Sequence, residues 1–269
     1  MNQLTQEQVQ AAVADVVQSF PFDGYITADM KRLSSLLVRT VAKIMGGTPN
    51  PKVLDIGSGP MNVTAVFARC GFQCSAVDDL SDPWHLAGEN RTKIMDFARR
   101  MGIEFCLHDA TYHIPFPKGT FDVVLLNSVL EHLHISPREV LNSAFEFLKP
   151  GGILVVTMPN SVNLRKRIRV LFGKTNLPSV QAVYDCEGTW RGHVREYTRA
   201  ETEYIVRRSG GQVILSKMIH SALKTRVPAW ARPPYLLVTR LVPTLRNAIL
   251  VIARRPADWR PGTRRSSEA

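Results

Sequence analysis

Short apolar runs alternate with helical segments through the first 160 residues, and this alternation limits the fold more than any other feature of the sequence. Five runs are predicted to be strands, namely 52–56, 73–77, 103–107, 121–127 and 153–158. The segments between them with helical apolar spacing are 63–70, 90–101 and 137–148. Because the strands are apolar throughout, the pattern favours an α/β fold with a parallel sheet covered by helices on both faces.

The rest of the chain extends this pattern less regularly. Helices are predicted at 3–18 and 29–45, before the first strand, and two further strands at 212–218 and 247–253. The segment 219–246 contains four prolines and receives no assignment. The hydrophobic content of 45% and the charged content of 21% are those of a globular protein, which excludes collagen-like, coiled-coil and disulfide-scaffold proteins.

Positive charge is concentrated in the C-terminal part of the chain. Residues 161–269 hold 21 Lys and Arg against 7 Asp and Glu, whereas residues 1–160 hold 13 against 16. One basic cluster is 165–169, and the other runs from Arg254 to Arg265. Such an imbalance favours contact with lipid headgroups, a phosphorylated substrate or nucleic acid. A solvated basic surface that maintains solubility is the alternative.

The sequence predicts a cytoplasmic protein. No run reaches the roughly 18 uninterrupted apolar residues that a membrane-spanning helix needs. The N-terminus, MNQLTQEQVQ, has no basic start followed by an apolar run, so no secretory signal is expected. The four cysteines match no zinc or redox spacing, and no other ligand cluster has metal-binding spacing. We therefore expect reduced thiols and assign no metal ligands.

A glycine turn is the sharpest motif in the sequence. Residues 53–60 read VLDIGSGP, where a predicted strand ends and a helix begins. Glycines at such a turn let a ligand approach the backbone, and the following helix offers free N–H groups. Asp78 lies at the end of the next strand, 21 residues after Gly57, where an acid can accept hydrogen bonds from a ribose diol.

Two cofactors fit a nucleoside site of this kind. A nicotinamide dinucleotide would place a pyrophosphate at the turn, but that motif needs a third glycine where Asn62 stands. It would also place an anion close to Asp55, which is unfavourable. S-adenosylmethionine has no phosphate, and its ammonium and sulfonium groups are positive. The electrostatics therefore favour S-adenosylmethionine.

At this point the chain resembles the class I S-adenosylmethionine-dependent methyltransferases, in particular those of types 11 and 23. The matching motifs stand in family order over roughly residues 50–160: VLDIGSGP, SAVDD, HDATYHIPFP, FDVVLLNSVLEHL and LKPGGILVVTMPN. The sequence departs from the family at Pro60 and at Met61, where a third glycine is common. The resemblance implies a cofactor site made of residues that hold the methionyl part (Asp55, Gly57, Gly59), the ribose (Asp78), the adenine (Asp109, Ala110) and the sulfonium side (Asn127).

The resemblance also implies the fold and its divisions. We expect a Rossmann-like sheet of seven strands, mostly parallel, with the last strand antiparallel. A helical cap is expected at 1–48 and the methyltransferase domain at 49–255, with a lid or acceptor region inserted at 160–200 after the fifth strand. Residues 256–269 are expected to form a flexible basic tail.

Histidines are the candidate bases for the acceptor. An oxygen acceptor needs a group that takes its proton, and histidine suits neutral pH. His132 lies after the fourth strand, on the side that faces the acceptor in this fold. His193 lies in GHVREYT, which is similar to a segment over the pocket in related methyltransferases. His132, His193 and Glu131 are therefore the predicted catalytic residues; His134 is a weaker candidate, and Glu131 can alternatively cap a helix. The residues predicted to bind the acceptor are Arg195, Glu196 and Tyr197.

The residues after the fourth strand narrow the acceptor class. The sequence there is Asn127-Ser128-Val129-Leu130, without the Pro-Pro-aromatic run of many nucleobase N-methyltransferases, and it has one glutamate rather than the pair of protein-arginine methyltransferases. O-methylation of a small-molecule, sugar or lipid-linked acceptor is the leading hypothesis, as in glycan or lipid biosynthesis. An N-methyltransferase and an RNA methyltransferase remain alternatives. The sequence leaves open whether a divalent metal helps to ionise an acceptor hydroxyl.

A hypothesis of another class is a non-catalytic protein that binds an anionic membrane or partner through its basic half. The helix predicted at 164–172 has apolar residues beside four basic ones, which suits a membrane interface and a pocket lid equally well. An active enzyme in peripheral contact with the membrane combines both ideas. The sequence leaves the oligomeric state open.

Overall fold

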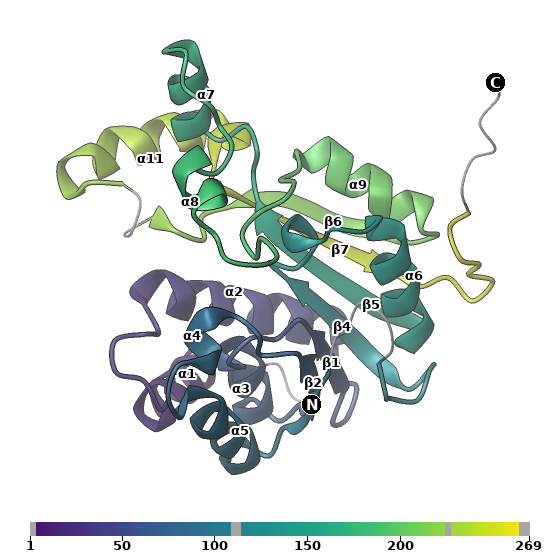
Figure 1. Cartoon of the computed structure of the whole chain (residues 1–269). Helices are drawn as coiled ribbons and strands as arrows, with labels where there is room; N and C mark the ends of the chain where they lie inside the picture. Colours follow the sequence, from purple (N-terminus) through teal and green to yellow (C-terminus); the bar gives the residue numbers. More distant parts are fainter. Residues whose placement is uncertain (1–3, 109–113, 224–226, 264–269) are drawn as a thin grey trace. The chain divides into compact units, whose positions relative to one another are not determined.

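The chain divides into two units that each hold part of one seven-stranded sheet. The computed structural model describes residues 4–108, 114–223 and 227–263 (Figure 1). The first unit comprises Met1–Pro115 and His220–Val242, and the second comprises Phe116–Ile219 and Pro243–Ala269. The strand order is β3-β2-β1-β4-β5-β7-β6. The strands are β1 (Lys52–Ile56), β2 (Gln73–Asp78), β3 (Glu104–Leu107), β4 (Phe121–Asn127), β5 (Leu148–Pro159), β6 (Gln212–Ile219) and β7 (Ala248–Arg254).

The strand directions confirm the predicted fold class. In the first unit β1 pairs with β2, and β2 with β3, both in parallel. In the second unit β4 pairs in parallel with β5, whereas β7 runs antiparallel to both β5 and β6. The prediction of a Rossmann-like, mostly parallel sheet with an antiparallel last strand is therefore confirmed.

The first two helices of the first unit begin at side chains that satisfy free backbone N–H groups. Thr5 caps α1 in a reciprocal pair with Gln8, and Thr27 caps α2. The helices α1, α2 and α3 contact one another, and α3 packs on β2 while α5 packs on β3. These helices are α1 (Gln6–Ser19), α2 (Ala28–Met45), α3 (Asn62–Arg69), α4 (Pro83–Leu86) and α5 (Asn90–Met101).

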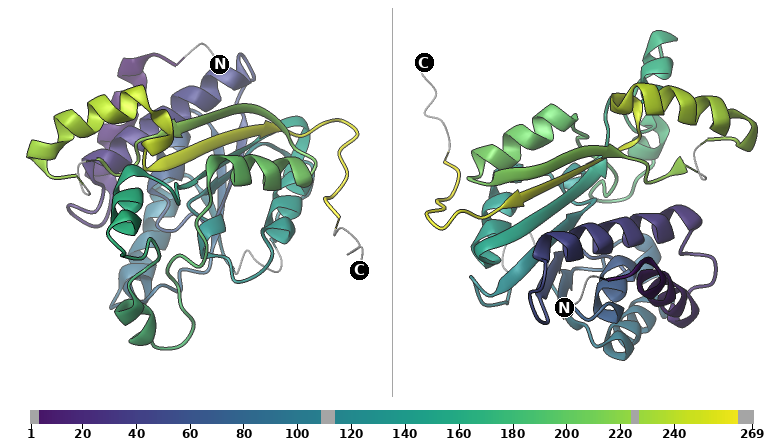
Figure 2. Two further views of the ribbon diagram at one scale, coloured as in Figure 1. Left: turned by 90° about the horizontal axis from the view of Figure 1, so that it is seen from above. Right: turned by 180° about the vertical axis from the view of Figure 1, so that it is seen from behind.

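Two helices of the second unit pack beside each other on its strands. Figures 1 and 2 show α6 (teal) and α9 (green), of which α6 contacts β4 and β5 while α9 contacts β6 and β7. Gly211, between α9 and β6, allows this packing because a Cβ atom there would lie 2.3 Å from the ring of Phe145. The helices are η1 (Leu130–His132), α6 (Pro137–Phe147), α7 (Leu164–Leu171), α8 (Val180–Tyr184), α9 (Arg199–Arg208) and η3 (Pro243–Leu245).

In the described part of the segment left unassigned by the sequence, the longest element is a helix. The segment contains η2 (Ala229–Ala231) and α11 (Arg232–Leu241). Pro233 and Pro234 lie in the first turn of α11, where a backbone N–H has no partner within the helix. Prolines at these positions start a helix instead of interrupting it, which is why the proline content was misleading. Across the described residues, no helix combines the length and the apolar character needed to cross a membrane.

The described part of the expected tail makes specific contacts with the second unit. The indole N–H of Trp259 donates to the carbonyl oxygen of Ser209 at 2.8 Å. The backbone of Gly262 exchanges two hydrogen bonds with the side chain of Asn142, at 2.9 and 3.0 Å. The Arg255 guanidinium lies over the Trp259 ring, 5.0 Å from its centroid. The chain as far as Gly262 therefore packs against α6 and the end of α9 through these hydrogen bonds.

Candidate active site

The predicted glycine turn joins β1 to α3 in the first unit. Gly57 and Gly59 have backbone φ angles of +71° and +54°, and Met61 has +60°. The N–H of Gly57 donates to the carbonyl oxygen of Val77 at 2.9 Å, which ties the turn to the end of β2. A Cβ atom on Gly59 would meet no atom within 4 Å. The positive φ, and not a lack of room, therefore favours glycine there, and the space beside its backbone is open to a ligand.

Asp55 supplies a buried carboxylate directly before this turn. The residue is 1% exposed, and one carboxylate oxygen accepts a hydrogen bond from the Thr64 hydroxyl at 2.5 Å. The other oxygen, Oδ1, has no hydrogen-bond partner among the described residues. Burial raises the pKa of Asp55 to about 7; the Thr64 hydrogen bond opposes the shift and the charge of Asp78 adds to it. A buried acceptor without a donor is unfavourable, so a cationic group such as the ammonium of S-adenosylmethionine fits here.

Asp78 ends β2 beside the turn. Its two carboxylate oxygens accept backbone N–H groups from Gly59 at 2.7 Å and from Leu80 at 2.8 Å. Burial raises the pKa of Asp78 and the charge of Asp79 adds to the shift, whereas the two N–H groups and His85 oppose it. Each carboxylate oxygen can accept more than one hydrogen bond. Asp78 can therefore bind ribose hydroxyls while it holds the glycine turn in place.

Asn127 lies at the end of β4 in the second unit. Its side-chain oxygen accepts a hydrogen bond from the Thr157 hydroxyl on β5. The next residue, Ser128, has a φ of +59°, which is uncommon for a residue other than glycine, and its N–H donates to the Thr157 carbonyl at 2.9 Å. The remaining predicted cofactor residues, Asp109 and Ala110, lie outside the described residues.

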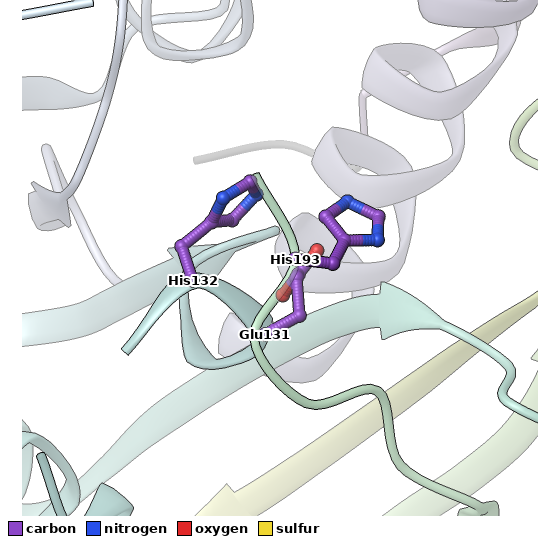
Figure 3. A group of neighbouring side chains, drawn as sticks. All are labelled: Glu131, His132 and His193. Atoms are coloured by element: carbon purple, nitrogen blue, oxygen red, sulfur yellow. The ribbon is translucent and has the colours of Figure 1, made fainter. Parts of the chain in front are cut away.

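The three predicted catalytic side chains form one cluster in the second unit (Figure 3). Glu131 and His132 lie on η1, and His193 lies on the segment before α9. One carboxylate oxygen and one nitrogen from each imidazole lie within 4.8 Å of one another. The cluster forms because the N–H groups of Val194 and Arg195 donate to the carbonyl oxygen of Glu131, at 2.7 and 3.2 Å.

The Glu131 carboxylate is buried, and no residue that the structure describes forms a hydrogen bond with it. The residue is 0% exposed, and neither carboxylate oxygen is hydrogen-bonded within the described part of the chain. Burial raises the pKa of Glu131 to about 7, and the nearby charge of Glu196 adds to the shift. Its own backbone N–H, His193 and the hydroxyl of Ser128 oppose the shift. Of these, the Ser128 hydroxyl has the smallest effect.

A buried ion pair orients His193. The Nδ1 atom of His193 lies 2.8 Å from Glu196 Oε1, and the Lys166 ammonium donates to the other carboxylate oxygen. Burial raises the pKa of Glu196, but the hydrogen bonds from His193 and Lys166 outweigh it and hold the pKa below its usual range. An ionised carboxylate only accepts, so the proton of the neutral imidazole is on Nδ1 and the lone pair is on Nε2.

Backbone carbonyls of the segment that precedes His193 orient His132 and His134. His132 Nδ1 lies 2.8 Å from the carbonyl oxygen of Arg191, and His134 Nε2 lies 2.7 Å from that of Trp190. The indole N–H of Trp190 donates to the carbonyl oxygen of His193 at 3.2 Å. A carbonyl oxygen only accepts, so Nδ1 of His132 also carries the proton.

The three residues predicted to bind the acceptor lie in different surroundings. The exposed guanidinium of Arg195 donates to Glu201 at 3.0 Å and lies 5.3 Å from the centroid of the Tyr197 ring. Tyr197 is 5% exposed, and its carbonyl oxygen accepts the N–H of Ser161. Glu196 is engaged with His193 and Lys166. Acceptor binding by these three residues stays a prediction.

Two contributing residues were not singled out from the sequence. Thr64 on α3 binds Asp55, and Lys166 was counted only as a member of the basic cluster 165–169. Lys166 is 7% exposed, whereas its neighbours Arg165 and Arg167 are exposed. The Asn163 side chain accepts the N–H of Lys166 at 3.2 Å and so begins α7. The sequence did contain one signal for Lys166: Asn163, three residues earlier, is a residue type that caps helices. A cap at Asn163 fixes the start of α7 and therefore the direction in which Lys166 points.

Known proteins resemble this chain in sequence and in fold. A family model described as a methyltransferase domain matches residues 23–214. The chain is 25% identical over 144 residues to a ubiquinone biosynthesis O-methyltransferase of Shewanella halifaxensis, covering 54% of this chain and 58% of that protein. It is 32% identical over 109 residues to a ubiquinone/menaquinone biosynthesis C-methyltransferase of Ruegeria sp., covering 40% and 42%. The match thus spans about half the length of these relatives.

A solved structure shares the fold at low sequence identity. The 1,6-didemethyltoxoflavin-N1-methyltransferase of Burkholderia thailandensis, solved with 1,6-didemethyltoxoflavin and S-adenosylhomocysteine, superposes with a TM-score of 0.54 at 18% identity, covering 95% of this chain and 92% of that one. The family match covers well over half of the chain, and the fold and the two carboxylates beside the glycine turn, Asp55 and Asp78, agree with it. The chain therefore belongs to the class I methyltransferases, enzymes whose cofactor is S-adenosylmethionine.

Proposed function

We propose that the enzyme methylates a hydroxyl oxygen of a small organic acceptor, which can be a free small molecule, a sugar or a lipid-linked compound. The observation that carries this proposal is the Glu196–His193 pair, because an acceptor hydroxyl needs a base and an imidazole with its Nδ1 fixed on a carboxylate is suited to that task. Relatives named as O-methyltransferases of ubiquinone biosynthesis support an organic acceptor.

The side chains divide the chemical work between binding and proton transfer. Asp55 binds the cofactor ammonium and Asp78 the ribose. When bound, S-adenosylmethionine supplies a methyl group on cationic sulfur; the acceptor oxygen forms the new bond to carbon, and the electron pair of the broken C–S bond stays on sulfur. His193 Nε2 takes the hydroxyl proton. Glu196 then stabilises the imidazolium, and Lys166 keeps Glu196 ionised.

Transfer of labelled methyl groups tests this proposal. The intact enzyme with methyl-labelled S-adenosylmethionine is expected to label phenolic, sugar or lipid hydroxyl fractions and to leave RNA and simple amines unlabelled. An Asp55→Asn variant provides the background rate. Label that appears only in RNA or in an amine would reject the oxygen acceptor in favour of the alternative classes.

An exposed apolar segment supports peripheral membrane contact as a second proposal. We define the docking segment as residues 164–184, which contain α7 and α8. Its apolar side chains face solvent, with Leu171 81%, Phe172 73% and Tyr184 87% exposed. The basic side chains exposed on the same segment are Arg165, Arg167, Arg169 and Lys174. Apolar side chains beside basic ones suit an anionic lipid surface, where a lipid-linked acceptor would also lie.

Vesicle sedimentation measures this contact directly. The enzyme is expected to sediment with vesicles of phosphatidylglycerol and phosphatidylcholine, and to do so less as salt rises, because screening weakens its basic contacts. The double variant Leu171→Ser/Phe172→Ser is expected to lose most of the binding. The control, Arg207→Gln/Arg208→Gln on α9, removes charge elsewhere and should bind nearly as well. Equal binding of both variants would contradict docking through this segment.

A further inference from the structure

Three side chains of the catalytic cluster converge (Figure 3). Glu131, His132 and His193 offer a carboxylate oxygen and two imidazole nitrogens within 4.8 Å of one another. A base needs one imidazole and one orienting group, which His193 and Glu196 already supply. The proposed base therefore gives no reason for a buried Glu131 carboxylate, neither oxygen of which has a partner among the described residues.

The groups around the two imidazoles are those found behind metal ligands. A histidine that binds a metal through one nitrogen commonly donates its other N–H to a carboxylate or a backbone carbonyl. His193 donates Nδ1–H to Glu196, and His132 donates Nδ1–H to the Arg191 carbonyl, each at 2.8 Å. In the neutral form of each ring the proton is therefore on Nδ1, which makes Nε2 the nitrogen that can act as a metal ligand.

We propose that Glu131, His132 and His193 bind one divalent transition-metal cation. Two imidazoles and one carboxylate favour ions such as Mn²⁺, Fe²⁺, Co²⁺ or Zn²⁺ over Mg²⁺ and Ca²⁺, which prefer oxygen ligands. Ligands about 2.1 Å from one tetrahedral ion lie about 3.4 Å apart, so a shift of less than about 1 Å in each side chain closes the site. The cation satisfies the Glu131 carboxylate, which no described protein group does.

The catalytic role of the cation rests on the proposed function, whereas its binding does not. Three protein ligands leave coordination positions open for an acceptor hydroxyl. Coordination lowers the pKa of that hydroxyl, and its proton passes to solvent before the oxygen is methylated. In the metal-bound enzyme His193 is then a ligand, and in the metal-free enzyme it is the base.

Cobalt binding to the intact, chelator-stripped chain tests the site without any acceptor. One equivalent of Co²⁺ is expected to bind with micromolar affinity or better, seen by equilibrium dialysis and by visible absorption of the bound ion. The variants Glu131→Gln and His132→Ala are expected to weaken binding at least 10-fold. His134→Ala is the matched control, because His134 contacts Trp190 and is not a ligand in the proposed site.

The outcomes separate this inference from the proposed function. No stoichiometric binding, or binding that Glu131→Gln and His132→Ala leave unchanged in folded protein, overturns the metal site. Thermal unfolding of each variant establishes that it is folded. If methyl transfer to hydroxyls then persists in chelator, the metal inference alone has failed. If Co²⁺ binds as expected but no hydroxyl is methylated, the proposed function alone has failed.

Discussion

Replacing Asp55 with asparagine is expected to weaken S-adenosylmethionine binding by about 100-fold or more, equivalent to about 2.7 kcal/mol. The carboxylate is buried, and its Oδ1 atom has no other partner in the described structure. In the variant the amide oxygen can still accept the Thr64 hydroxyl, so the amide N–H₂ faces the cofactor ammonium and repels it. A charged hydrogen bond becomes an unfavourable contact. Isothermal titration measures the change.

The same substitution is expected to stabilise the cofactor-free protein at alkaline pH. The pKa of Asp55 is about 7 in the folded chain and 3.8 as its reference value. Between these values the unfolded chain has lost the proton while the folded chain retains it. The free energy of unfolding of the natural protein therefore falls as pH rises from about 4 to about 7 and stays low above that range. The asparagine variant has no ionisable group at this position, so its free energy of unfolding does not fall in this way.

Urea unfolding at two pH values measures whether the free energy of unfolding changes with pH in the expected direction. The stability difference between Asp55→Asn and the natural protein is expected to widen from pH 5 to pH 8 by roughly 1–3 kcal/mol in favour of the variant. Asp258→Asn, the same change at an exposed position, should show no such widening. A variant that is less stable than the natural protein at pH 8 would show that burial does not penalise the Asp55 charge.

Replacing His193 with alanine is expected to lower turnover by about 10²–10⁴-fold, which is the usual contribution of a positioned proton acceptor. The affinity for S-adenosylmethionine should change little, because the carboxylates proposed to hold the cofactor are in the first unit. Glu196→Gln is expected to be milder: glutamine can still accept Nδ1–H but cannot stabilise an imidazolium charge. Lys166→Met should resemble Glu196→Gln, because it leaves Glu196 without its buried cation.

The comparison of kcat with KM distinguishes this role from a structural one. A group that takes the proton lowers kcat, whereas a group that only binds the acceptor raises its KM. Arg199→Gln, an exposed change on α9, is the control. If His193→Ala retains the natural kcat and only KM rises, His193 binds the acceptor and the base must be sought elsewhere.

Local patterns were enough to predict the sheet and the carboxylates beside the glycine turn. The strand around Asp55 and the turn at Gly57 are encoded within a few consecutive residues, and the structure has them where the motif predicts. The proline-rich segment with α11 received no assignment, because its four prolines leave the local pattern ambiguous, whereas in the structure Pro233 and Pro234 lie in the first turn of a helix.

The arrangement of the catalytic cluster could not be read from the sequence. Glu131 and His193 are 62 positions apart, so linear spacing shows no metal-ligand pattern. The burial of Lys166 depends on the direction of α7, and a basic run alone suggests a solvated surface. The cluster depends on hydrogen bonds between η1 and the segment before α9, and such contacts between distant residues are known only from a three-dimensional structure.

The double hydrogen bond from Val194 and Arg195 to the Glu131 carbonyl has a consequence for engineering. Chimeras that graft residues 160–198 from a homologue would exchange the proposed acceptor region and the imidazole at position 193 in a single step. The Glu131 anchor uses backbone N–H groups alone, so it tolerates side-chain divergence in the graft, provided that no proline occupies either donor position. Such hybrids would leave unchanged Asp55 and Asp78, the carboxylates proposed to bind the nucleoside.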